Sequence, residues 1–440
     1  MLDTLMVGTL GEAEMAAVSA ANTPTFAMEL LIFGLQSGSA VLISQFWGKG
    51  DRRSISRVVG IGGYIAGAVS IVFATLLMAF PSQTMALFAG EQNLIDIGAE
   101  YIGIVGLSYV FMSITAIYTA LHRGTENPRL GLYIFGTGMV VGTFVDWILI
   151  FGHFGVPAMG VRGAAIGTLV AHVLEFIIMI FHAIYSKRFR INVRAMLRPG
   201  KPLIAKYIKY SSPVLVNETL WGLGTALFPT IMGHMDNSQQ ILAAHTIAGN
   251  VADMASVVVF AVAGSSAIII GREIGRGNRD KVYEIGSALN GVSVIVGFVM
   301  GLIMIVLNYT IMDTVVFPFF KLSPLSATIS TMMMTVYGLC LTLRSFNSTN
   351  IVGVLRGGGD VKAATLIDCL PLWCVSVPLA AILGLVFRVD MTWVYLAMML
   401  DTLIKSFFGV GRFRSKKWIN DVTAGIEIFE YDAALAAVVE

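Results

Sequence analysis

The 440-residue sequence contains little charge and few cysteines. Only 13% of its residues are Asp, Glu, Lys or Arg, whereas soluble domains carry about 25%. A soluble chain of this length would need a charged shell around two or three cores, and there are too few charges to form one. The three cysteines lie in apolar runs without metal-site spacing, so we predict buried free thiols rather than a disulfide framework.

Residue pairs typical of membrane-embedded enzymes are also missing. No D-x-x-x-D or H-x-x-x-H pair occurs at a predicted cytoplasmic helix end, where a prenyl-transferase binds magnesium through an aspartate box. We therefore predict that the chain is not an enzyme, needs no cofactor and has no metal site.

Long hydrophobic runs account for most of the chain. Hydrophobic residues make up 56% of it, and its mean hydropathy is +0.79. About 20 apolar residues of helix cross a bilayer core, so the sequence predicts an all-α integral membrane protein in contact with the lipid bilayer. Eleven runs are long enough to be full spans: 14–46, 55–80, 94–121, 128–151, 160–186, 203–232, 242–271, 281–307, 325–355, 362–387 and 391–411.

The basic residues are distributed very unevenly among the loops. Of 29 Lys and Arg residues, 24 fall in one alternate set of loops and three in the other. The positive-inside rule places the first set in the cytoplasm. We therefore predict a multi-pass protein of the plasma or inner membrane with a cytoplasmic C-terminus. Topology explains the basic central loop better than nucleic-acid binding does, so we expect no nucleic-acid partner.

The chain contains two copies of one pattern. GSAVLISQFWGKGDRR at 38–53 matches SSAIIIGREIGRGNRD at 265–280, which aligns Gly48 with Gly275, and LHRGTENPR at 121–129 resembles VLRGGGDVK at 354–362. A repeat this long indicates two homologous bundles. We predict two six-helix lobes related by an internal parallel repeat, with this organisation: N-lobe 1–186, basic cytoplasmic linker 187–202, C-lobe 203–414 and cytoplasmic tail 415–440.

The same repeat predicts a shortened first helix. The partner of the run at 203–232 would begin before residue 1, and only the stub MLDTLMVG at 1–8 is present. We expect about 25 residues of that helix to be absent, because eight residues cannot span a bilayer. The prediction is a twelve-span fold with eleven full spans plus an N-terminal stub.

Four stretches resemble motifs of the multidrug and toxic compound extrusion (MATE) family: LDTLMVGTLG (2–11), GSAVLISQFWGKGD (38–51), LRGGGD (355–360) and RFRSKKW (412–418). Each is weak alone, but four in order over nearly the whole chain are specific. The resemblance implies a V-shaped pair of lobes that exports small amphipathic or cationic compounds by alternating access, driven by inward H+ or Na+. A two-lobe parallel repeat is what alternating access requires physically. We expect a monomer.

Ionisable residues within spans are costly, so each is a candidate for function. The resemblance implies that Asp3, in the stub, and Asp146, in the middle of a span, carry the coupling ion or proton. The family usually has Asn four residues before the second aspartate; here Gly142 removes that oxygen and weakens a sodium cage. Thr168 could add a hydroxyl, although a packing face of small residues explains it equally well.

Glu218 occupies the position at which one branch of the family has a cation-binding glutamate. That branch pairs the glutamate with an acid in the tenth helix, where this sequence has Arg344, Asn347 and Asn350 instead. We predict that these three residues, together with Glu218 and Thr168, bind the substrate or a cation. Two hypotheses stay open. Glu218 either forms an intramembrane salt bridge with Arg344 or binds the positive charge of the substrate.

The other charges in or near spans are predicted to be structural. Arg356 is interpreted as an anchor at the cytoplasmic face, and Asp360 as the N-cap of the following helix. The remaining members of this group lie in spans but away from both sets of motif residues: Glu29, Glu175, Asp253, Asp368, Asp401 and Lys405.

Two alternatives to drug export remain. A lipid-linked oligosaccharide flippase of the same superfamily would need several basic residues to hold a pyrophosphate, and Arg344 is the one clear candidate. The other alternative is a truncated remnant without function.

Overall fold

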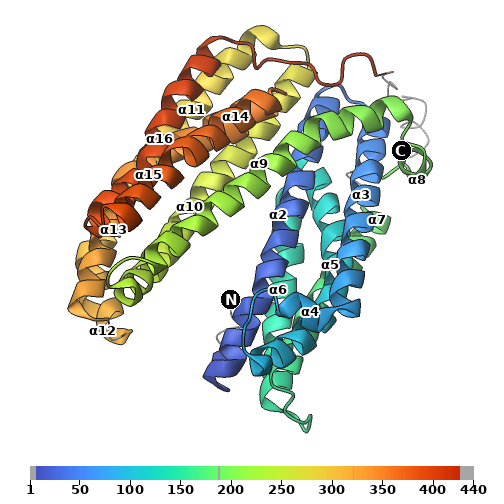
Figure 1. Cartoon of the computed structure of the whole chain (residues 1–440). Coiled ribbons are helices and arrows are strands. Elements are labelled where there is room, and N and C mark those ends of the chain that lie inside the picture. Colours follow the sequence, from blue (N-terminus) through green and yellow to red (C-terminus); the bar gives the residue numbers. More distant parts are fainter. Residues whose placement is uncertain (1–5, 187–188, 321, 427–440) are drawn as a thin grey trace. The chain divides into compact units, whose positions relative to one another are not determined.

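In the computed structural model, residues 6–186, 189–320 and 322–426 are described, and this part of the chain is built from helices without any strand. Ten of these helices are long and apolar enough to cross a membrane (Figure 1). The predicted all-α membrane class is therefore confirmed.

The chain forms two compact units. Among the described residues, the N-terminal unit contains 6–43 and Gly50–Ser211, and the C-terminal unit contains Ser44–Lys49 and Ser212–Gly425. The division falls inside the long helix α9 (Lys201–Gly233). The linker predicted at 187–202 stays a prediction.

The N-terminal unit is made of long helices with clear start and stop signals. Asp51 begins α3 by accepting a hydrogen bond from the backbone N–H of Ser54. Gly152 ends α6 in the left-handed conformation that glycine adopts readily. α3 packs on α5, and α7 packs on both α5 and α6. The bounds are α2 (Glu12–Gly48), α3 (Arg52–Ala79), α4 (Pro81–Met85), α5 (Gln92–Gly124), α6 (Arg129–Phe151), α7 (Val161–Tyr185) and α8 (Val193–Leu197).

The C-terminal unit has a similar order of long helices, interrupted by four π-helical segments, η1 to η4. The described residues of the N-terminal unit contain no π-helical segment. Such wide turns are frequent at functional sites. α13 packs on α10, α11 and α16. The bounds after α9 are α10 (Ser238–Gly275), α11 (Arg279–Leu307), η1 (Asn308–Val316), α12 (Phe317–Phe319), α13 (Pro324–Asn347), η2 (Ser348–Leu355), α14 (Val361–Pro371), η3 (Leu372–Ser376), α15 (Val377–Ala381), η4 (Ile382–Val386) and α16 (Met391–Arg414).

One of the eleven predicted spans is not among the ten apolar helices. The run at 203–232 forms α9, whose 33 residues are enough to cross a bilayer. It contains two internal prolines together with Lys206, Lys209 and the polar pair Asn217–Glu218. These residues lower its hydropathy, and the polar pair enters the candidate site.

The order of the elements repeats along the chain. α3 begins at Arg52 and α11 begins at Arg279, and these two arginines are aligned with each other in the sequence repeat. α7 begins at Val161 and α16 begins at Met391, with nearly the same separation along the chain. The helix boundaries therefore follow the sequence repeat, as expected for two homologous bundles.

The ends of α2 and α10 meet at a pair of repeat-related glycines. A Cβ on Gly48 would collide with the backbone of Arg272, and a Cβ on Gly275 would collide with the backbone of Gln45. Gln45 and Arg272 are aligned with each other in the sequence repeat, as are the two glycines. The contact is therefore reciprocal: Gly48 of the first repeat packs on Arg272 of the second, and Gly275 of the second packs on Gln45 of the first.

The segment after α16 folds back onto the C-terminal unit, and we call residues 415–425 the strap. Trp418 in the strap is fully buried. Lys49 forms an ion pair with Asp421 at 2.8 Å. Gln45 donates a hydrogen bond to a strap carbonyl at 3.0 Å and accepts one from a strap N–H at 2.8 Å. The strap thus fixes the end of α2 within the C-terminal unit.

The cysteines are all free thiols. Cys369 is buried and Cys340 is half-buried, but Cys374 is exposed on the helix surface. The prediction of buried thiols is therefore wrong for Cys374, because an apolar run alone does not tell which face of a helix meets lipid.

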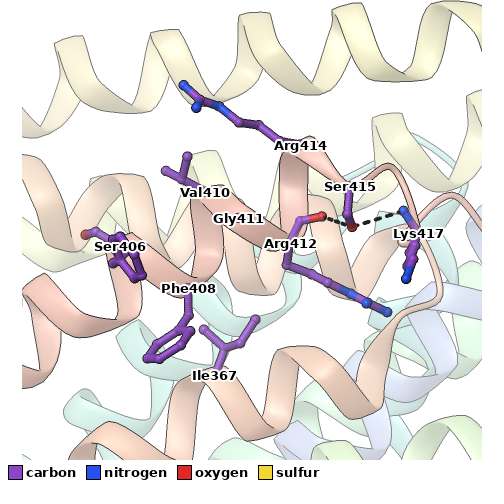
Figure 2. A pocket seen from close by; sticks show the side chains of 10 residues that line it. Ile367, Ser406, Phe408, Val410, Gly411, Arg412, Arg414, Ser415 and Lys417 are labelled. Atoms are coloured by element: carbon purple, nitrogen blue, oxygen red, sulfur yellow. Dashed lines mark hydrogen bonds between the residues drawn. The ribbon is translucent and has the colours of Figure 1, made fainter.

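A groove of about 800 Å³ lies along the last turns of α16 and the start of the strap, where basic residues gather (Figure 2). Its walls come from α16, from Ile367 of α14 and from Ser415 and Lys417 at the start of the strap.

Candidate functional site

α9 carries Asn217 and Glu218 into the interior of the C-terminal unit, where both are buried. Oε1 of Glu218 lies 2.9 Å from Nη1 of Arg356, which directly follows η2 and is 1% exposed. Breaking such a pair is costly, because either group alone would leave an uncompensated buried charge.

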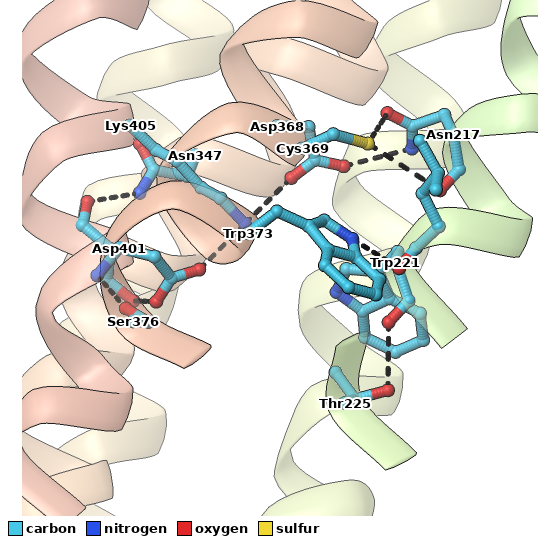
Figure 3. A network of polar contacts seen from close by, with 12 residues as sticks. Asn217, Trp221, Thr225, Asn347, Asp368, Cys369, Trp373, Ser376, Asp401 and Lys405 are labelled. Atoms are coloured by element: carbon cyan, nitrogen blue, oxygen red, sulfur yellow. Dashed lines mark hydrogen bonds and ion pairs between the residues drawn. The ribbon is translucent and has the colours of Figure 1, made fainter. Parts of the chain in front are cut away.

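Lys405 lies between two aspartates. Its Nζ is 2.9 Å from Oδ1 of Asp368 in α14 and 2.8 Å from Oδ2 of Asp401, one turn earlier in α16 (Figure 3). The backbone N–H of Asp401 donates to the hydroxyl of Ser376 in η3 at 2.9 Å. Lys405 therefore links α14 to α16, and the π-helical segment supports the junction.

Asn217 joins these two groups of charges. Its Nδ2 donates to Asp368 at 3.0 Å and makes a longer 3.5 Å contact with Glu218. The thiol of Cys369 donates to the Asn217 side-chain oxygen at 3.4 Å. Together they form one connected set, which we call the interior network: Asn217, Glu218, Arg356, Asp368, Asp401 and Lys405.

The interior network has three carboxylates and two cations. Arg344 interacts electrostatically with Asp401, and Asp253 with Arg344, so including both still leaves a surplus of one negative charge. Within a membrane such a surplus favours the binding of a proton or a cation. The described residues contain no cluster of three or more His, Cys, Asp or Glu that could hold a metal ion.

The predicted salt bridge of Glu218 exists, but its partner is wrong. Glu218 pairs with Arg356, whereas Arg344 lies over the ring of Tyr337, 4.8 Å from the ring centroid. The interpretation of Arg356 as a face anchor is also wrong, because its guanidinium is buried and paired with Glu218. The positive-inside count assigns every basic residue near the end of a span to a loop, so it does not recognise a basic side chain that is buried, such as that of Arg356.

Asp368, Asp401 and Lys405 were predicted to lie away from the motifs, and this is wrong. They contact Asn217, the chain neighbour of Glu218, either directly or through one another. One signal could have found part of this group. Residues four apart on a helix face the same side, so an Asp and a Lys at that spacing within a span predict an internal ion pair.

The two predicted asparagines connect helices. Asn347 donates to the carbonyl of Thr402 at 2.7 Å and accepts from Ser406 at 3.0 Å. The side-chain oxygen of Asn350 accepts from Asn290 at 3.1 Å. Their predicted role in substrate or cation binding stays a prediction, as does that of Arg344.

Asp360 precedes α14 as predicted, but its side chain makes no capping hydrogen bond. The carboxylate instead accepts from Nε of Arg412 at 2.6 Å. Asp360 therefore holds the predicted N-cap position, but its carboxylate pairs with a guanidinium from another helix and does not cap a backbone N–H.

Asp146 lies in α6 of the N-terminal unit and is 6% exposed. It packs against Gly167 of α7, where any larger side chain would collide with its carboxylate. Its predicted partner Asp3 lies outside the described residues. The proton-responsive pair therefore stays a prediction.

Close packing explains the departure from the family pattern at Gly142. A Cβ at this position would lie 2.9 Å from the Cβ of Ala171 in α7, which leaves no space for an asparagine. Thr168 donates its hydroxyl to Ala164 of its own helix at 3.1 Å. This contact favours the packing interpretation of Thr168.

A sequence profile of the MatE family matches residues 1–148 and 213–382. The chain belongs to the MatE family. The resemblance found in the sequence motifs is thereby confirmed, and the profile covers both units of this MatE protein. Family members are membrane transporters.

Named bacterial relatives match most of this MatE protein. The probable multidrug resistance protein NorM of Thermotoga maritima is 24% identical over 95% of this chain and 88% of its own length. The probable multidrug resistance protein YoeA of Bacillus subtilis is 25% identical over 85% of this chain and 80% of its own length. The solved structure of a multidrug resistance MATE family transporter in an outward-facing conformation shares the fold, with a TM-score of 0.84, 15% identity and coverage of 94% and 91% of the two chains.

Proposed function

We propose that this MatE protein is a secondary active transporter that exports small amphipathic or cationic compounds in exchange for protons. The observation that carries the proposal is the surplus negative charge of the interior network. Such a site can hold an organic cation or a proton, and a ligand that binds one state better shifts the equilibrium towards it. Alternating access of two bundles then couples the opposite movements.

The names of the relatives support export of drugs, because both are described as probable multidrug resistance proteins. The charge balance supports a cationic rather than an anionic substrate. A flippase for a pyrophosphate-linked oligosaccharide would need a surplus of basic groups. Arg356 and Lys405 are buried in the interior network, but each is already paired with an acid.

The occupied oxygens of the interior network favour a proton over sodium as the coupling ion. Sodium needs several oxygen ligands, whereas Lys405, Arg356 and Asn217 already donate to the carboxylates. A proton needs one carboxylate oxygen. Asp368 is the most exposed of the three acids, with 16% of its side chain accessible, so we assign the exchange of protons to it.

Transport by the purified protein in liposomes tests this proposal, with ethidium as the cationic probe. We expect a proton gradient to drive ethidium movement and a sodium gradient to leave it unchanged. Asp368→Asn should lower proton-driven transport at least about tenfold, which corresponds to ~1.4 kcal/mol of coupling. The variant should still fold, because the new amide can keep a hydrogen bond with Asn217, and Lys405 keeps its ion pair with Asp401.

Asp236→Asn is the matched control, because Asp236 lies in the same unit but is exposed at the turn before α10. It should retain coupling. If Asp368→Asn stays coupled and Asp146→Asn does not, the N-terminal unit holds the coupling site. Transport driven by a sodium gradient alone would identify sodium, and not the proton, as the coupling ion. Absence of any gradient-driven ethidium movement by the unaltered protein would contradict cation export.

We also propose a monomer in the plasma membrane with its C-terminus in the cytoplasm. The basic loops support this orientation. Impermeant thiol labelling of Arg194→Cys, in a protein whose three native cysteines are replaced, checks it. The introduced cysteine should be labelled only after the cells are lysed. Labelling of this cysteine in intact cells would contradict the predicted topology.

A further inference from the structure

In the groove along the end of α16, a glycine without a side chain lies between apolar residues. Gly411 lies in its lining, and apart from its chain neighbours and the nearby backbone of its own helix, no atom comes within 4 Å of where a Cβ would be. Phe407 and Phe408 are 78% and 55% exposed. Ile367 of α14 contributes another apolar side chain. This surface belongs to a membrane-spanning helix, so its apolar part suits acyl chains rather than water.

The basic residues around this groove divide into two kinds. Nε of Arg412 is held by Asp360 at 2.6 Å, and Nζ of Lys416 lies 4.6 Å from the ring centroid of Tyr283. Arg414 and Lys417 are exposed and line the groove.

Within the described part of the chain, no acidic side chain forms an ion pair with Arg414 or Lys417. Two positive charges therefore remain available at one end of the groove. They lie at and just beyond the last residue of the candidate span, Arg414, and basic residues at the end of a membrane helix are suited to contact lipid headgroups.

The turn after α16 holds one of these charges in position. The hydroxyl of Ser415 donates to the carbonyl of Arg412 at 2.6 Å and accepts from the backbone N–H of Lys417 at 3.4 Å (Figure 2). In the same view Arg414 and Lys417 extend from opposite sides of the segment. A headgroup over Gly411 would thus have a cation on either side.

We propose that this groove binds one anionic phospholipid. The acyl chains lie against Phe407, Phe408 and Ile367, and the phosphate is bound by Arg414 and Lys417. Apolar walls with unpaired basic side chains at headgroup depth complement the two parts of such a lipid. Basic sites at the ends of membrane helices bind anionic headgroups in this way. The proposal does not depend on the transported compound or on the coupling ion.

Native mass spectrometry of the purified full chain measures this binding directly. The probes are dioleoyl phosphatidylglycerol, dioleoyl phosphatidylcholine and inorganic phosphate, each titrated separately. We expect one saturable phosphatidylglycerol site. Arg414→Gln and Lys417→Gln should each weaken it about fivefold, since a basic residue near a membrane surface contributes about 1 kcal/mol.

Gly411→Trp tests the apolar half of the site. The open space at Gly411 lets an indole fill the groove without a clash, so phosphatidylglycerol binding should be lost while the unfolding temperature is retained. Lys416→Gln is the matched control, because it removes a neighbouring charge that does not line the groove, and it should leave binding unchanged.

Three results would overturn the proposal. The first is equal affinity for phosphatidylcholine. The second is unchanged phosphatidylglycerol binding in Gly411→Trp. The third is inorganic phosphate binding as tightly as the lipid, which would make this a phosphate site without a role for the apolar walls.

Discussion

Helices α7 and α16 occupy corresponding places in the two units, yet they carry opposite charges at the same position. Their fifteenth residues are Glu175 and Lys405. Glu175 contacts one ionisable partner, His172, at 3.0 Å, whereas Lys405 contacts both Asp368 and Asp401. The repeat preserves the position of an interior charge but not its sign or its number of partners. The energetic cost of disturbing it should therefore differ between the units.

Removing Lys405 should have the largest effect on stability. Lys405→Met leaves two carboxylates in the interior without their cation, and breaking a buried ion pair in this way costs about 3–5 kcal/mol. We expect a marked fall in the free energy of unfolding, measured by SDS-induced unfolding of the purified protein in lipid–detergent micelles. The triple variant that adds Asp368→Asn and Asp401→Asn should recover much of the loss.

Glu175→Gln provides the comparison in the N-terminal unit. It removes one interaction with a histidine and keeps a polar side chain of the same size, so the loss should be about 1 kcal/mol. Equal losses for Lys405→Met and Glu175→Gln would show that the two positions are energetically equivalent despite their different partners.

The sequence predicted the helical class, the repeat and the family, because all three depend on patterns that extend over many residues. It could not predict which charges meet. Glu218 in α9 and Arg356 after η2 are far apart in the sequence, so no local pattern shows that they meet. The prediction placed Arg356 at the cytoplasmic face because it lies in a basic, glycine-rich segment that follows a span.

The prediction also failed where polar side chains compete for partners. Asp360 has the position of an N-cap, but Arg412 binds its carboxylate from a different helix, distant in the sequence. Local patterns rank only the partners that are near in sequence. Cys374 shows the same limit for apolar runs, because hydropathy does not distinguish the lipid-facing side of a helix from its packed side.

The contact between the ends of α2 and α10 at Gly48 and Gly275, which we call the glycine crossing, should lose similar stability when either glycine is replaced. The interior charges, in contrast, should not respond equally in the two units. Gly48→Ala and Gly275→Ala each place a methyl group against backbone atoms, and overpacking of this kind costs about 1–3 kcal/mol. We expect similar losses of unfolding free energy for the two variants. Gly249→Ala in α10 is the control, since nothing lies within 4 Å of its Cβ position. A large loss at one glycine alone would contradict the reciprocal contact.

The strap should contribute the smallest effect, and one that depends on pH. Burial raises the pKa of the Asp421 carboxyl, but hydrogen bonds from Lys49 and Thr423 and the charge of Lys49 outweigh it, so the net pKa lies below its usual range. A lowered folded-state pKa stabilises the fold above the unfolded value of about 3.9. That stabilisation is lost as the pH falls through the folded-state value.

Asp421→Asn should therefore lower the free energy of unfolding at pH 7 by less than about 1 kcal/mol, because a partly exposed ion pair contributes little. The difference from the unaltered protein should narrow as the pH is lowered from 5 towards 3, because the unaltered carboxyl then becomes neutral as well. Lys49→Met, which removes the other partner, should show a difference that narrows over the same interval. A difference that stays constant or widens at low pH would show that Asp421 acts through packing and not through its charge. The strap would then resemble the neutral contacts of the glycine crossing rather than the charged interior of its own unit.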